Sequence, residues 1–128
     1  MTTYNKRLKT VCGRLHHDAL ASKTYVIPAQ PGVIRVVDAR LTVIGGAMTT
    51  AATVTLEADD AGTVDIVTFG AGTLDHDKDT VRAGGTDGTI GAGFNVDLTA
   101  GSGVTIVSNA EMSVATDVDY VVEYVTGG

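Results

Sequence analysis

Slightly more than a third of this chain is β-branched, and that feature restricts its fold more than any other. The 128 residues include 18 Val, 6 Ile and 19 Thr. β-Branched side chains pack well on the pleated surface of a sheet and lose conformational freedom in a helix. Aromatic residues make up only 5% and Trp is absent, so the core must be aliphatic. The sequence therefore predicts an all-β protein of a size that suits one core.

Alternation of apolar and polar residues marks the expected strands. Val54, Leu56 and Ala58 share one parity, and Asp59-Asp60-Ala61-Gly62 then leads to residues 64–69, which predicts a β-hairpin. The longest strand expected is Val33–Ile44, where the apolar parity switches and predicts a bulge near Val36–Val37. The other expected strands are 25–27, 94–98, 104–107 and 113–125, and we expect 104–107 to pair with 94–98. Residues 75–93 are predicted to be an exposed polar loop, with only a weak strand signal at 80–82.

About eight short strands joined by turns predict an antiparallel β-sandwich, of which a jelly roll is one form. We expect this domain to span residues 23–128. Residues 1–22 form a separate basic N-terminal arm in this interpretation. Tyr4, Leu8, Val11, Cys12 and Leu15 follow helical spacing, although Gly13 interrupts it. The arm is thus extended or briefly helical and orders against a partner; the alternative is a segment that packs on its own domain.

Charge is distributed unevenly along the chain. Residues 1–24 contain five Lys or Arg and one Asp, a net charge of +4, whereas the remainder contains four against 14 acids, a net charge of −10. A basic arm on an acidic body predicts that the arm contacts something the body does not. The acidic body and the lack of aromatic residues beside the arm argue against nucleic acid as that partner. No apolar run is long enough to cross a membrane, and no signal peptide is evident.

The chemistry-bearing residues of the chain do not assemble into a recognisable catalytic or metal motif. Asp75, Asp77 and Asp79 alternate as a calcium loop does, but Thr80 and Thr86 stand where that loop needs Gly and Glu. A solvated acidic loop is the favoured interpretation, and these three Asp remain weak metal candidates. The single Cys12 has no evident base partner. We therefore expect no enzymatic activity and no cofactor.

The pattern as a whole resembles the head decoration, or cement, proteins of tailed bacteriophages. The resemblance covers most of the chain. It rests on the short arm, the Val33–Ile44 strand before Gly45-Gly46, the Ala100–Gly103 turn before Val104-Thr105-Ile106, and the run Asp119–Tyr124. It implies a β-sandwich or jelly roll, often trimeric, on the outer surface of the capsid. The virion is then its location, after synthesis in the host cytoplasm.

The first hypothesis is therefore a structural protein that stabilises a phage capsid as a homotrimer and binds the major capsid protein through its arm. The basic contacts predicted are Lys6, Arg7, Lys9 and Arg14, and the apolar contacts are Tyr4, Leu8, Val11 and Leu15. The alternative is a carbohydrate- or receptor-binding β-sandwich of a phage fibre or tail. Sugar sites present exposed aromatic faces, and we expect Phe69 and Phe94 to be in the core instead.

Overall fold

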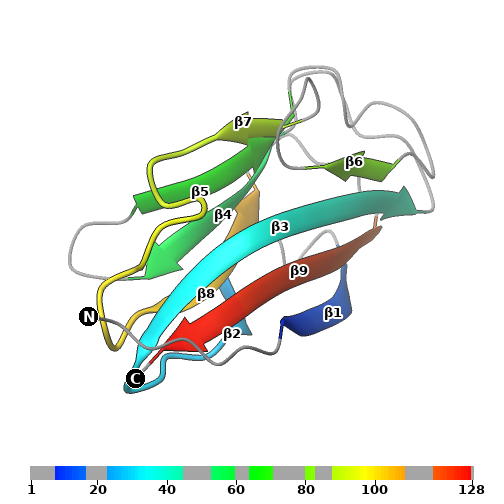
Figure 1. Cartoon of the computed structure of the whole chain (residues 1–128). Coiled ribbons are helices and arrows are strands. Elements are labelled where there is room, and N and C mark those ends of the chain that lie inside the picture. Colours follow the sequence, from blue (N-terminus) through cyan, green and yellow to red (C-terminus); the bar gives the residue numbers. More distant parts are fainter. Residues whose placement is uncertain are drawn as a thin grey trace.

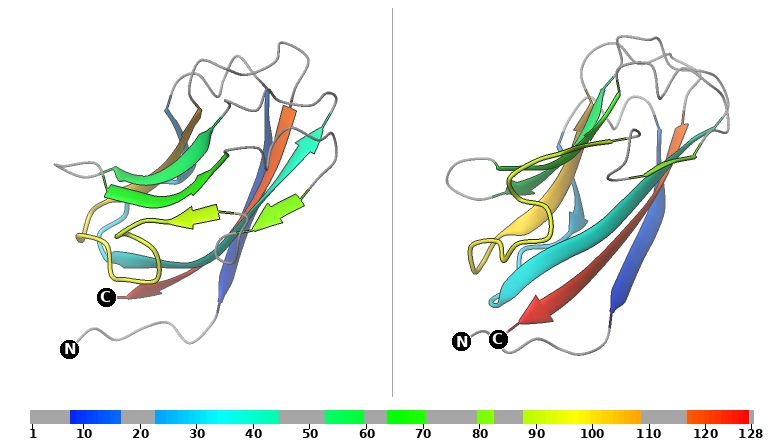
Figure 2. Two further views of the ribbon diagram at one scale, coloured as in Figure 1. Left: turned by 90° about the horizontal axis from the view of Figure 1, so that it is seen from above. Right: turned by 45° about the horizontal axis from the view of Figure 1, so that its top comes forward.

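The computed structural model describes residues 8–16, 23–44, 53–59, 64–70, 80–82, 88–108 and 117–127. Two antiparallel sheets lie face to face, one of four strands and one of five (Figures 1 and 2). The predicted all-β antiparallel sandwich is confirmed. No helix in the described residues is long and apolar enough to cross a membrane.

Sheet A has the strand order β1-β9-β3-β6. Its long central strands are β3 (Val33–Ile44) and β9 (Asp117–Gly127), flanked by β1 (Lys9–His16) and the short β6 (Thr80–Arg82). The pairing of β3 with β9 shifts register between Val36 and Asp38, so the predicted bulge is confirmed. Because of that shift, Ile34 and Val36 face the core together with Ala39, Leu41 and Val43 despite their different parity.

Sheet B has the strand order β2-β8-β4-β5-β7. It consists of β2 (Thr24–Ile27), β4 (Val54–Asp59), β5 (Val64–Phe69), β7 (Gly88–Ile90) and β8 (Gly103–Ser108). The predicted hairpin of β4 with β5 is confirmed. The expected strand at 80–82 is present, whereas β7 lies in a region predicted to be loop.

The core between the sheets is almost wholly aliphatic, as the composition requires. Its largest fully buried side chains include Phe69, Ile27, Ile34, Leu41 and Leu56. Phe94 packs against this cluster. The prediction that Phe69 and Phe94 belong to the core is confirmed.

Residues 91–98, here called the connector, join the edges of the two sheets. The Gly91 and Gly93 amides donate to the carbonyls of Ile66 and Asp65 on β5, each at 2.9 Å. The Asn95 and Leu98 amides donate to Val36 and Ile34 on β3, at 2.8 and 2.9 Å. The connector therefore closes the sandwich on the side where β6 leaves the start of β3 uncovered (Figure 1).

The expected strand at 94–98 is wrong. These residues form turns and a bend, and Asn95 adopts a positive φ of 54°, which ends the regular alternation of a strand. The expected pairing of 104–107 with 94–98 is also wrong, because β8 lies between β2 and β4.

Candidate interaction surface

The part of the predicted arm that the structure describes is an edge strand. Residues 9–16 form β1 and pair with β9 from Lys9 opposite Tyr124 to His16 opposite Asp117. The helical interpretation is wrong for this segment, and the alternative of a segment packed on its own domain describes it. Tyr4, Lys6 and Arg7 lie outside the described residues. The division of the chain at residue 22 stays a prediction.

Strand geometry divides the predicted contact residues between two faces. Val11 and Leu15 point inward and pack against the core cluster. Arg14 points to the outer face, and Leu8, just before β1, is 48% exposed. The structure thus brings these residues to one edge of sheet A but does not place their apolar side chains on one free surface.

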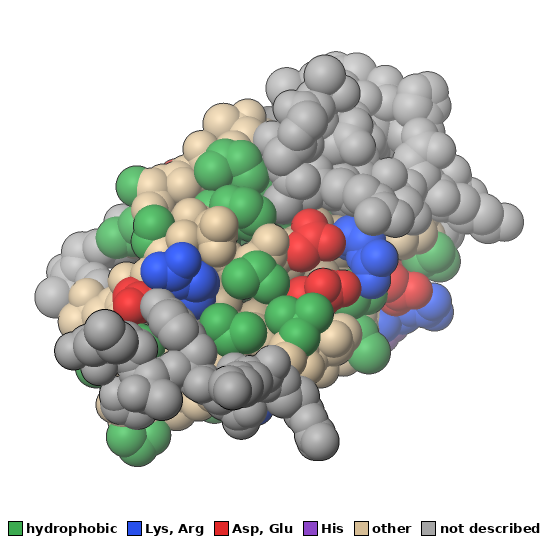
Figure 3. Space-filling view, viewed as in Figure 1, with side chains coloured by type: hydrophobic (Ala, Val, Ile, Leu, Met, Phe, Trp, Pro, Cys, Tyr) green, Lys and Arg blue, Asp and Glu red, His purple; other side chains and the backbone are tan. Residues whose placement is uncertain are grey.

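The outer face of sheet A carries a series of ion pairs between neighbouring segments. Arg14 binds Asp119 through two contacts, Nε to Oδ1 at 2.6 Å and Nη2 to Oδ2 at 3.0 Å. The other pairs are His16–Asp117 at 2.8 Å, Arg35–Asp97 at 3.1 Å and Arg40–Glu123 at 3.8 Å. Figure 3 shows charged side chains of both signs on this face, with apolar side chains between them. Much of its charge is therefore already neutralised within the chain.

The Arg14–Asp119 contact changes the titration of both groups. The hydrogen bond from Arg14 outweighs partial burial and, with a smaller contribution from the positive charge of Arg14, holds the pKa of Asp119 below its ordinary value. The same hydrogen bond, and the negative charge of Asp119, raise the pKa of Arg14. Both side chains remain partly exposed, so salt screens this pair and its contribution to stability is small.

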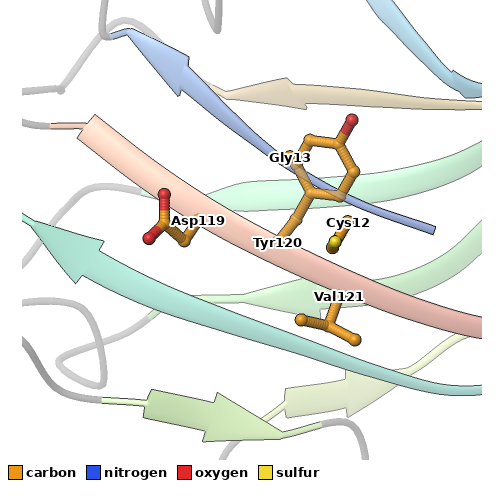
Figure 4. A pocket seen from close by; sticks show the side chains of 5 residues that line it. All are labelled: Cys12, Gly13, Asp119, Tyr120 and Val121. Atoms are coloured by element: carbon orange, nitrogen blue, oxygen red, sulfur yellow. The ribbon is translucent and has the colours of Figure 1, made fainter. Parts of the chain in front are cut away.

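A shallow hollow of about 290 Å³ lies over the β1–β9 pair. It is lined by Cys12, Gly13, Asp119, Tyr120 and Val121, and Figure 4 shows the Tyr120 ring reaching across to Gly13. A Cβ at Gly13 would lie 2.6 Å from the Tyr120 hydroxyl oxygen. The ring therefore occupies the space that a larger side chain on β1 would fill. Burial, and secondarily the charge of Cys12, raise the pKa of Tyr120.

The outer face of sheet B carries a second cluster, which the sequence analysis did not single out. Tyr25, Thr105, Glu57 and Asp65 occur side by side on four adjacent strands, since each is the register partner of the next. We call these four residues the acidic row. Lys23 lies 3.6 Å from Glu57, and the Tyr25 hydroxyl donates to Asp59. The alternation of residues 53–58 indicated the outward direction of Glu57, but only the strand order brings Asp65 and Tyr25 close to it.

The metal candidates Asp75, Asp77 and Asp79 lie outside the described residues. Within the described ranges, no group of three or more His, Cys, Asp or Glu side chains is arranged to hold a metal ion.

Comparison with known proteins gives a likeness in fold. No protein-family model matches the chain, and no curated protein matches its sequence. A solved structure described as the cyanophage Pam1 capsid asymmetric unit contains a similar chain, with a TM-score of 0.50 and 16% identity. The likeness covers 92% of this chain and 84% of that one. The resemblance to phage head proteins is thus confirmed at the level of the fold.

Proposed function

We propose that this chain is a non-enzymatic structural protein of a phage virion, which decorates and stabilises the outer surface of the capsid as a homotrimer. The single observation that carries the proposal is the fold shared with a chain of the cyanophage Pam1 capsid asymmetric unit over 92% of this chain. Synthesis in the host cytoplasm and assembly onto the major capsid protein belong to the same proposal.

The order in which the strands pair supports a jelly roll. The pairs β1–β9, β2–β8, β3–β6 and β4–β5 are nested, with the first strand against the last and the middle two forming a hairpin. Two interlocked Greek keys of this kind make up the jelly rolls of viral capsid domains. β7 is an addition at the edge of sheet B. We propose that the sandwich is a jelly roll on this ground.

The proposed anchor is the basic segment that ends in β1. Lys6, Arg7 and Lys9 supply positive charge there, and Tyr4 and Leu8 supply apolar surface. Arg14 is already bound to Asp119, and Val11 and Leu15 pack against the core. These last three residues therefore join the anchor only if β1 leaves β9, whereas residues 4–8 precede β1 and contact the capsid without that change.

Capsid stabilisation follows from binding to the assembled shell. A protein that binds the assembled form and not its free subunits shifts the equilibrium towards assembly. A trimer presents three anchors at once, so three weak contacts hold more firmly than one. Neither effect needs a catalytic group.

The test is co-sedimentation with cognate capsids of a variant lacking residues 1–8, which retains all of β1. We expect binding to be lost while the melting temperature stays close to that of the intact chain. Lys6→Glu with Arg7→Glu is expected to lose binding as well, and the matched control Lys6→Arg with Arg7→Lys to keep it. Full occupancy by the shortened chain would contradict the proposed anchor.

A further inference from the structure

The acidic row on sheet B places two like charges directly opposite each other. Glu57 of β4 is the register partner of Asp65 of β5, and both point to the outer face. Like charges at directly opposed positions of an antiparallel pair destabilise the sheet. Lys23 partly compensates Glu57 at 3.6 Å, whereas Asp65 makes no ion pair with any described residue. The acidic row therefore favours the binding of a further positively charged group beside Asp65.

A buried hydroxyl with no partner lies in the same row. Thr105 is the register partner of Glu57 on β8 and of Tyr25 on β2. Its neighbours Val104 and Ile106 point into the core, so its side chain points to the outer face, yet it is only 2% exposed. Its Oγ1 has no hydrogen-bond partner in the described part of the chain. A buried polar atom without a partner is costly and points to a group supplied from outside.

An exposed aromatic ring ends the row. Tyr25 is 52% exposed, and its hydroxyl is fixed by the hydrogen bond to Asp59. Exposed Tyr is typical of protein interfaces, and its ring face attracts Lys and Arg. Sheet A has a comparable acid pair, Asp38 opposite Glu123, with Arg40 beside it. Among the described residues, however, that pair is accompanied by no unpartnered buried hydroxyl.

The charge distribution of the chain indicates where the basic group comes from. Residues 1–16 contain Lys6, Arg7, Lys9 and Arg14 and no acid. Arg14 is bound to Asp119, and Lys9 makes no ion pair with a described residue. The segment around the start of β1 therefore carries positive charge in excess, and the remainder of the chain carries negative charge in excess. Two copies are complementary when this segment of one meets the acidic row of the other.

We propose that the acidic row, formed by Tyr25, Thr105, Glu57 and Asp65, receives one Lys or Arg side chain from the N-terminal segment of a second copy of this chain, and that the other basic side chains of that segment stay available to the capsid. The contact is head to tail, since the two surfaces differ, and such contacts generate closed rings when the rotation fits. The inference rests on the proposed function in one respect, because it identifies the contact between copies of the proposed homotrimer.

The test is sedimentation velocity of the purified full chain without capsids, over a range of protein concentrations and at low and high salt. We expect the intact chain to associate, and salt to weaken the association. Asp65→Lys is expected to raise the dissociation constant between copies at least about tenfold. The matched control Asp38→Lys makes the same charge change on sheet A and is expected to shift that constant by less than about threefold. Melting curves check that both variants fold.

A charge exchange makes the test specific for the partner. Adding Lys6→Glu and Arg7→Glu to Asp65→Lys is expected to restore association. An intact chain that stays monomeric at every concentration would overturn the inference, as would equal effects of the two Lys substitutions. A monomer that nevertheless binds capsids would contradict this contact and support the proposed function. A chain that associates through the acidic row but does not bind capsids would support this contact and contradict the proposed function.

Discussion

Two glycines show how tightly the surrounding atoms restrict the side chain at a single position of this fold. Gly13 lies beneath the Tyr120 ring in sheet A, and Gly103 lies beside the Tyr25 ring in sheet B. The surroundings differ in stiffness. A Cβ at Gly13 meets a side chain, whereas a Cβ at Gly103 meets the Ala29 amide at 2.8 Å and the Ile27 carbonyl at 2.9 Å. Backbone yields less readily than a ring.

Gly103→Ala is accordingly expected to destabilise the protein more than Gly13→Ala does. Overpacking against rigid atoms costs about 1–3 kcal/mol, and we place Gly103→Ala within that range and Gly13→Ala below it. Urea unfolding of the two variants measures the difference. A larger loss for Gly13→Ala would show that the Tyr120 ring is held more tightly than the β2 backbone.

The Arg14–Asp119 pair predicts a pH dependence of known sign. The folded pKa of Asp119 is lowered, chiefly by the hydrogen bond from Arg14, relative to the ordinary value of 3.8. Its contribution to stability is therefore complete above the unfolded pKa and is lost as the pH falls through the lower folded pKa. A carboxyl titration by NMR should show Asp119 ionising below its ordinary range, and returning towards that range in Arg14→Ala. An unchanged Asp119 titration in that variant would contradict the assignment.

At the scale of elements, the alternation of apolar and polar residues predicted those features that depend on residues close together in the sequence. The parity switch in Val33–Ile44 located the bulge, and clean alternation located the β4–β5 hairpin. The segment of β1 was predicted to be extended or briefly helical, because its apolar residues follow helical spacing and Gly13 interrupts the inward alternation of Val11 and Leu15. The missing side chain is supplied by Tyr120, more than a hundred residues away, so no local signal reveals the strand.

The strand predicted at residues 94–98, in the connector, is wrong for a related reason. Phe94, Val96 and Leu98 alternate like a strand, but Asn95 has a positive φ and the amides of Asn95 and Leu98 bind the edge of β3. Leu98 is buried and Phe94 packs against the core as the alternation suggested, whereas Val96 is 41% exposed. The partner that fixes this geometry is the bulged start of β3, which tertiary structure alone brings there.

The connector makes a prediction about stability. Leu98 is 5% exposed, and Leu98→Ala is expected to cost about 2–4 kcal/mol because it removes buried apolar contacts and leaves a cavity. Val96→Ala, two positions away and exposed, is the matched control and is expected to change the free energy of unfolding by less than about 0.5 kcal/mol. Chemical denaturation compares them. Equal effects would show that the connector is not part of the core.

At the scale of the whole molecule, the sequence predicted the properties that depend on composition better than it predicted the interaction surfaces. An aliphatic core, two antiparallel sheets and an uneven charge all follow from residue content and alternation. The acidic row did not, because its four residues come from four strands whose order is set by long-range pairing. The apolar residues of the predicted anchor share one face at helical spacing, whereas the structure distributes the described anchor residues over the two faces of β1.

The proposed role as a capsid protein is tested most directly by electron cryomicroscopy of cognate capsids mixed with the purified chain. We expect added density on the outer surface, at positions of local threefold symmetry, into which three copies of the sandwich fit with their N-terminal segments against the shell. Capsids mixed with the variant lacking residues 1–8 should lack that density. Capsids that remain bare with the intact, folded chain would contradict the account.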